Sequence, residues 1–185
     1  MSNKTNVDGV EVIADTLARN SLDHAVEARK IGDMLNYHVL QNRMMVSLVS
    51  PGMPDLFFFH GRRLGEALGR RLKKNSARNL REALDEYSKY VQENNLARVE
   101  IASVDRTRAV LRMFDCANCF GLPNIGKKLC FYDAGQQSGM ISVLLGSRFI
   151  SHETGCLTNG DAYCEFKIEM MSSTEVFREA FKGEK

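Results

Sequence analysis

Apolar residues recur every three or four positions along three stretches of the chain, and this is the spacing of amphipathic helices. The stretches cover residues 10–40, 56–74 and 76–94, and Ser76 stands where an N-cap residue would begin the third. Between the first two, the segment SPGMPD at 50–55 contains two of the three prolines and predicts a loop. The pattern therefore predicts helices on both sides of a loop near the end of the first quarter of the chain.

The same loop predicts the domain organisation. Residues 1–50 are expected to form an N-terminal helical extension, and residues 51–185 are expected to form the main domain. The last segment, 173–185, is predicted to be a short helix or tail. One core-bearing domain is therefore expected after the extension.

Glycines line one face of the helix predicted at 56–74. Gly61, Gly65 and Gly69 recur at every fourth position, although each glycine costs a helix about 1 kcal/mol relative to alanine. Such a row indicates that another element approaches this face closely. Tight packing on a sheet is favoured over a contact between two copies of the chain.

The hydrophobic period then changes to two, which predicts strands. Residues 97–105 and 107–115 form one predicted hairpin, and residues 148–154 and 162–170 form a second. A helix is predicted between them at 127–146. This order of elements predicts an α+β domain, in which helices pack on an antiparallel β-sheet.

Composition and charge argue against several classes of protein. Of the 185 residues, 44% are hydrophobic and 26% are charged, which is typical of a globular protein with a core. The net charge of +2 is too balanced to indicate a nucleic-acid partner, and no apolar run approaches the roughly 20 residues that a membrane span needs. The N-terminus lacks a secretory pattern, so we expect a cytoplasmic protein whose thiols stay reduced.

Two of the five cysteines flank one short turn in the segment HETGCLTNGDAYCEF at 152–166. The Asn-Gly-Asp turn at 159–161 predicts a hairpin that brings Cys156 and Cys164 together, and two thiolates make half of a zinc site. An odd number of cysteines argues against a disulfide framework, and plain packing of buried thiols is the other alternative. The residues by themselves leave the remaining ligands open, and the candidates are His152, Glu153, Cys116, Cys119 and Cys130.

The segments LCFYDAGQQSGMISVLLG and ISHETGCLTNGDAYCEF resemble the 4-vinyl reductase domain, also called the hydrocarbon-binding domain, and the likeness covers about residues 56–170. The chain is similar to archaeal stand-alone members of this family. The resemblance implies an antiparallel sheet with helices packed on it, as in subunits of a vesicle-tethering complex. In the aromatic-sensing bacterial regulators of the family, the domain binds a small hydrophobic effector and carries a structural zinc.

The resemblance also implies a set of zinc ligands, which by their place in the family pattern are Cys130, Glu153, Cys156 and Cys164. Three thiolates and one carboxylate fill all four tetrahedral positions, so the Zn²⁺ is expected to be structural. Cys116 and Cys119 remain as a CxxC pair, for which redox sensing, a second metal site and plain packing are the alternatives.

The function that the resemblance implies is a non-catalytic sensor or carrier of a small hydrophobic or aromatic molecule, acting as a homodimer without nucleic-acid or membrane partners. A tetrapyrrole (4-vinyl) reductase or its accessory protein is an alternative, although the chain lacks the GxGxxG nucleotide fingerprint. A redox-sensing regulator and a scaffold subunit are further alternatives. The ligand pocket is predicted to be lined by Phe58, Phe59, His60, Met113, Phe114, Phe120, Tyr132 and Met140.

Overall fold

The computed structural model describes residues 53–72 and 77–172. The predicted extension (1–50) and the predicted C-terminal helix or tail (173–185) lie outside the described residues, so the division into extension and domain stays a prediction. The described helices are α3 (Met53–Leu72), α4 (Leu80–Glu93) and α5 (Phe131–Leu145). The described strands are β1 (Arg98–Val104), β2 (Arg108–Phe114), β3 (Phe149–Gly155) and β4 (Cys164–Met170).

The strands form one four-stranded sheet in the order β1-β2-β4-β3, and every neighbouring pair is antiparallel. The pairs β1–β2 and β3–β4 are the two predicted hairpins, and the pairing of β2 with β4 joins them. Along β4, Cys164, Phe166 and Ile168 are buried, because alternate residues of a strand face the same side. The predicted α+β architecture is therefore confirmed.

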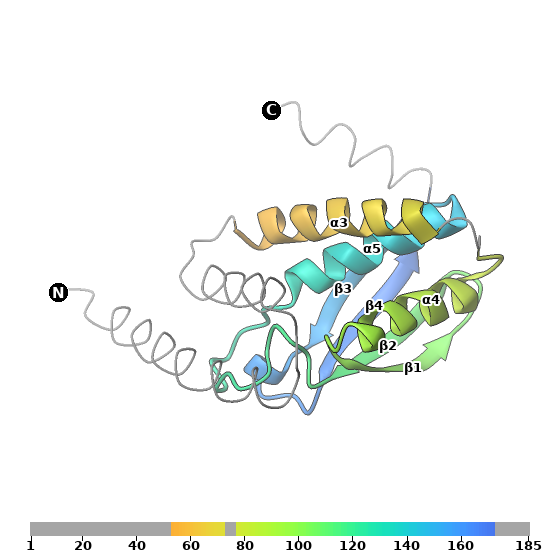
Figure 1. Ribbon diagram of the computed structural model, residues 1–185. Coiled ribbons are helices and arrows are strands. Elements are labelled where there is room, and N and C mark those ends of the chain that lie inside the picture. The colour runs from red at the N-terminus through yellow and green to blue at the C-terminus, as the bar shows by residue number, and fades with distance from the viewer. Residues whose placement is uncertain (1–52, 73–76, 173–185) are drawn as a thin grey trace.

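The helices cover one face of the sheet in two layers (Figure 1). α5 packs on β3, α4 packs on β1, and α3 lies on the outer side of α5. The opposite face of the sheet presents charged residues that pair across strands, such as Arg112 with Glu165, whose Nε and Oε2 atoms lie 3.0 Å apart. The core lies between the sheet and the inner helices, where Tyr87 and Phe166 are fully buried.

The glycine row of α3 packs against a helix and not against the sheet, so the predicted partner was wrong. A Cβ atom at Gly61 would overlap the carbonyl oxygen of Tyr132, and one at Gly65 would overlap that of Gln136. The same holds in reverse for Gly135 of α5, which lies against the backbone of α3. The two helices are therefore in direct backbone contact, a fact that the glycine spacing on one helix cannot reveal.

Two helix boundaries differ from the prediction. Pro54, predicted to lie in a loop, stands in the first turn of α3, where its missing N–H costs no helical hydrogen bond. α4 starts directly after Asn79, whose side chain accepts a hydrogen bond from Glu82 N at 3.0 Å. The predicted cap, Ser76, lies outside the described residues.

The connection between β3 and β4 is longer than the tight turn predicted at 159–161. It contains a short 3-10 helix, η2 (Leu157–Asn159), which Gly160 follows with a φ of 97°. A Cβ atom at Gly160 would come within 2.7 Å of Asn124 Nδ2, so glycine suits both this conformation and this contact. The connection therefore packs against the loop between β2 and α5, which also carries cysteines.

Candidate metal centre

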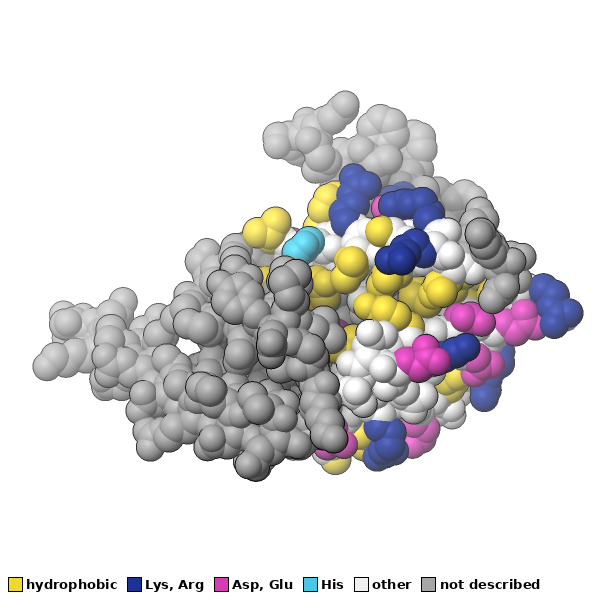
Figure 2. Space-filling model, viewed as in Figure 1, with side chains coloured by type: hydrophobic (Ala, Val, Ile, Leu, Met, Phe, Trp, Pro, Cys, Tyr) yellow, Lys and Arg dark blue, Asp and Glu magenta, His cyan; other side chains and the backbone are white. Residues whose placement is uncertain are grey.

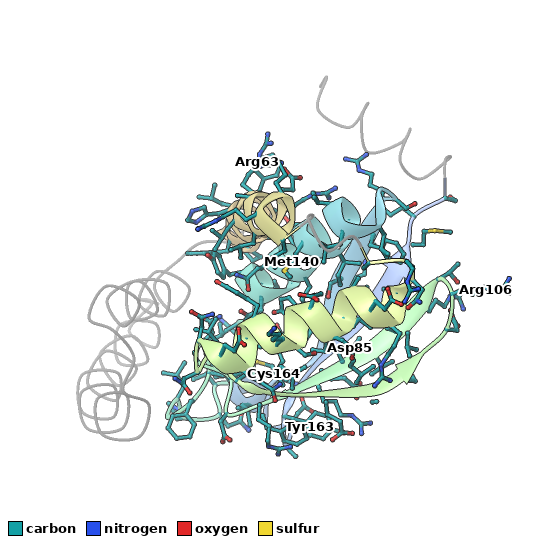
Figure 3. The ribbon with its side chains drawn as sticks, turned by 45° about the vertical axis from the view of Figure 1, so that its right-hand side comes forward. Arg63, Asp85, Arg106, Met140, Tyr163 and Cys164 are labelled. Carbon is teal, nitrogen blue, oxygen red and sulfur yellow. The ribbon has the colours of Figure 1, made fainter. Side chains whose placement is uncertain are left out.

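All five cysteines meet in the core at one end of the sheet. Each has an exposed fraction of 0% or 1%, and all five thiols are free. Figure 3 labels Cys164 in the region between α4 and the sheet. The contributing positions are Cys116 and Cys119 after β2, Cys130 at the N-cap of α5, Cys156 after β3, and Cys164 at the start of β4.

The distances between the sulfur atoms suit a metal site. Cys130 Sγ lies 3.0 Å from Cys119 Sγ and 3.6 Å from Cys164 Sγ. Cys116 Sγ lies 3.6 Å from Cys130 Sγ, and Cys156 Sγ lies 3.9 Å from Cys164 Sγ. Because Zn–S bonds are about 2.3 Å long, the sulfurs of a tetrahedral site lie about 3.8 Å apart. Small side-chain shifts would therefore bring these thiols to ligand positions.

Glu153 adds an oxygen from the inward face of β3. Strand alternation buries Glu153, which is 6% exposed, and leaves His152 exposed and outside the cluster. The Oε2 atom of Glu153 accepts a hydrogen bond from Cys130 N at 3.0 Å, whereas Oε1 is buried and has no hydrogen-bond partner among the described residues. A buried oxygen without a partner is costly, and a cation would satisfy it. The donor set therefore fits a divalent metal ion.

Two overlapping groups of four side chains have the geometry to hold an ion, and within each group the ligand atoms lie within 4.8 Å of one another. The predicted group is Cys130, Glu153, Cys156 and Cys164. The other group is Cys116, Cys119, Cys130 and Cys164. The CxxC spacing marked the first two of these in the sequence, but only the folded loop shows that they touch the other cysteines.

Burial and mutual contact set the protonation of the cluster. Desolvation raises the pKa of the Glu153 carboxyl to about 10, and burial also raises the pKa of the Cys130 thiol. Hydrogen bonds from neighbouring thiols, that of Cys119 first, lower the pKa of Cys156. Glu153 and Cys130 therefore hold protons at neutral pH, and a bound divalent cation would displace them because it takes the anionic forms as ligands.

Contacts outside the cluster hold its loops together. Thr158 of η2 donates from Oγ1 to the carbonyl of Lys127 at 2.7 Å, and its own carbonyl accepts from Ile125 N at 2.8 Å. Cys156 N donates to Asp161 Oδ2 at 2.8 Å. These bonds join the loop before α5 to the β3–β4 connection, so the fold itself positions ligands that lie far apart in the sequence.

The eight residues predicted to line a ligand pocket do not come together in one place. Met113 is fully buried, whereas Phe59 is 57% exposed and His60 is also exposed on α3. Met113 and Phe114 follow each other on β2 and point to opposite faces, and the Phe114 ring lies 5.3 Å from that of Tyr163. The others are half-buried, namely Phe58, Phe120 and Tyr132, or fully buried, namely Met140.

A buried polar group, which the sequence reasoning missed, lies next to Met113. Gln137 of α5 is 0% exposed, and its Oε1 accepts a hydrogen bond from Ser151 Oγ at 2.7 Å. Its Nε2 lies 3.5 Å from both Tyr87 Oη and Met113 Sδ. The available signal was the pair of glutamines between two glycines of an otherwise apolar helix. A polar group in such surroundings is the kind that orients a bound small molecule.

Two surface hollows are lined by described residues, and neither includes a residue predicted for the pocket. One, of about 390 Å³, lies between α4 and β1 beside Asp85 and Lys89. The other, of about 470 Å³, lies beside Arg108 and Glu169. Their charged rims differ from a mostly apolar ligand site. None of the described helices combines the length and apolarity needed to span a membrane.

The geometry defines a class of protein, namely an α+β domain in which strand ends and a helix start converge on a buried, thiol-rich candidate metal centre. Residues 109–170 match the family model of the 4-vinyl reductase domain, and this stretch contains all five cysteines. The chain therefore belongs to the 4-vinyl reductase domain family, which confirms the family that its sequence resembles.

Similar proteins agree with this assignment. MJ1642 of Methanocaldococcus jannaschii, an uncharacterized protein, is 31% identical over 106 residues, which cover 57% of this chain and 62% of that protein. The match thus spans less than two thirds of that relative's length.

Two solved structures share the fold. The phenol-responsive sensory domain of the transcription activator PoxR, solved with phenol, has a TM-score of 0.53 at 15% identity, covering 97% of this chain and 98% of that chain. Subunit 3 of a trafficking protein particle complex from Naegleria fowleri, covalently bound to palmitic acid, has a TM-score of 0.50 at 12% identity, covering 86% and 96%. At these identities the similarity shows the fold alone.

Proposed function

We propose that this chain is a non-catalytic module that binds a small hydrophobic or aromatic molecule as a sensor or carrier, and that a structural Zn²⁺ stabilises it. The proposed ligands are Cys130, Glu153, Cys156 and Cys164. Glu153 carries the metal part of the proposal, because its buried Oε1 lies within 4.8 Å of three thiols and has no hydrogen-bond partner among the described residues.

The proposed ion would connect the start of α5 to the ends of β3 and β4. All four ligands come from the protein, so no position is left for water or substrate, and the role is structural. Met113 on β2 pairs with Cys164 on β4, and its sulfur contacts Gln137. The metal centre therefore lies one residue away from the buried polar group of α5, and its loss would disturb that group.

The class of guest is inferred from chemistry that other proteins of this fold contain. Phenol is bound in the PoxR sensory domain, and palmitic acid is attached to the Naegleria subunit. In this chain, Gln137, Ser151 and Tyr87 offer polar atoms within an apolar core. A phenol or a fatty acyl chain is therefore the guest to test first.

Thermal unfolding with a series of phenols and fatty acids tests the binding proposal, since a ligand that binds only the folded state raises Tm. We expect one class to raise Tm and the same class to be released when the purified protein is denatured and extracted. Gln137→Leu should reduce the shift that a phenol causes, whereas Arg63→Ala, on the outward side of α3 (Figure 3), should leave it unchanged. If neither class raises Tm and nothing is extracted, the binding proposal is wrong.

Homodimer formation is also proposed, with α3 as the contact. Figure 2 shows hydrophobic side chains on the surface around this helix. Leu56 and Phe59 are 56% and 57% exposed, and Leu64 is 36% exposed. Light scattering should give the mass of a dimer for the wild type and that of a monomer for Phe59→Asp. A monomeric wild type would contradict this part of the proposal.

A further inference from the structure

The cluster holds more ligands than one ion can use. Five thiols and one carboxylate lie together, whereas a tetrahedral zinc site takes four ligands. We propose that the cluster binds two divalent metal ions, bridged by the thiolates of Cys130 and Cys164. This inference rests on the proposed metal centre, but the number of bound ions separates the two.

The two four-ligand groups share only Cys130 and Cys164. The remaining ligands are Cys116 and Cys119 for one ion, and Glu153 and Cys156 for the other. Six side chains, two of them bonded to both ions, provide the eight bonds that two tetrahedral ions need. The two-ion centre thus uses every thiol in the chain.

The bridging role falls to sulfurs with neighbours on both sides. Cys130 Sγ lies 3.0 Å from Cys119 Sγ and 3.6 Å from both Cys116 Sγ and Cys164 Sγ. Cys119 Sγ also lies 3.4 Å from Cys156 Sγ, although the two belong to different ions in the bridged centre. The second ion must therefore move Cys119 outward. This movement falls on the loop after β2 and leaves the strands paired.

Formal charge is compatible with two ions. Five thiolates and one carboxylate carry six negative charges, and two divalent cations reduce this to two. One zinc on three thiolates and one carboxylate leaves the same net charge, but Cys116 and Cys119 then remain as a buried thiol pair beside Asp133, whose Oδ2 is 3.5 Å from Cys116 Sγ. The second ion gives this pair a ligand function at no increase in buried charge.

The spacing of the sulfurs disfavours an iron–sulfur cluster. In such a cluster, inorganic sulfide lies between the irons that the cysteines bind, so the cysteine sulfurs are spread apart. Here Cys130 Sγ touches the sulfurs of Cys116, Cys119 and Cys164 at 3.0 to 3.6 Å. Direct thiolate bridges between divalent ions match this compact arrangement better.

Counting bound zinc tests the proposal. The reduced full-length chain, titrated with Zn²⁺ alone, should hold two ions in native mass spectrometry, and Cys116→Ala/Cys119→Ala should hold one. Asn118→Ala is the matched control, because Asn118 lies between the two cysteines and its side chain donates to Asp133 at 2.7 Å without being a ligand candidate. This control should keep two ions.

Titration with Co²⁺ tests the bridge itself. The first equivalent should give the paramagnetic signal of an isolated ion, and the second should weaken that signal, because shared thiolates couple the two ions. The double variant should keep the uncoupled signal at saturation. If the double variant does not fold, the zinc count and the coupling in the wild type still decide the question.

One ion in both the wild type and the double variant would overturn the two-ion centre and leave the single structural zinc in place. One ion in the wild type and none in the folded double variant would overturn both, as would a folded wild type without bound zinc. Bound iron with acid-labile sulfide would replace both by a different centre.

Discussion

Replacing Gly65 by alanine tests the backbone contact between α3 and α5. The added Cβ would overlap the carbonyl oxygen of Gln136 and lie 2.9 Å from Met140 N, and backbone atoms cannot move aside as side chains do. Overpacking of this kind costs about 3 kcal/mol at the upper end of its usual range, and the higher helix propensity of alanine returns about 1 kcal/mol. We therefore expect a net loss of about 2 kcal/mol, or about 4–8 °C in Tm for a chain of this size.

Urea and thermal unfolding followed by circular dichroism would measure this loss, and two further variants calibrate it. At Gly69 the Cβ would meet the side chain of Val143 at 2.9 Å and Met140 O at 3.0 Å, so Gly69→Ala should cost less than Gly65→Ala. Ala67→Gly, at an exposed position of α3, should cost about 1 kcal/mol through propensity alone. A Gly65→Ala protein as stable as the wild type would refute the contact between the two backbones.

Three other predictions concern the interior. Cys156→Ser should lose bound zinc and lower Tm, since a structural site contributes folding free energy directly, and elemental analysis with calorimetry would reveal a variant that keeps both. In protein stripped of metal, Glu153 has a pKa of about 10 when folded against an ordinary value of 4.5, so the folded state binds more protons between these values and stability should fall as pH rises through that window. Urea unfolding at several pH values should show a smaller slope for Glu153→Gln, and an unchanged slope would contradict the assignment. Ser151→Ala should cost about 1–3 kcal/mol in urea unfolding, because it leaves the buried Gln137 Oε1 without its 2.7 Å hydrogen bond, and a loss below about 0.5 kcal/mol would count against this role.

Some of the metal centre followed from the sequence. The period-two pattern of β4 placed Cys164 on the same face as Phe166 and Ile168, and the structure agrees. The prediction that Cys156 and Cys164 lie together needed only a hairpin, which is a local structure. Pocket residues such as Met113 and Phe114 were harder, because a strand pattern says which residues share a face but not which other elements surround it.

The sequence by itself determined the order of the helices and strands, the α+β class and the family, since these depend on periodicities and motifs that are local along the chain. Only the tertiary structure decided that the glycines of α3 lie against α5, that β2 pairs with β4, and that Cys116 and Cys119 join the other thiols. The physical reason is that these contacts join segments far apart along the chain. Their selection depends on the packing of the whole core, and no single segment carries that information.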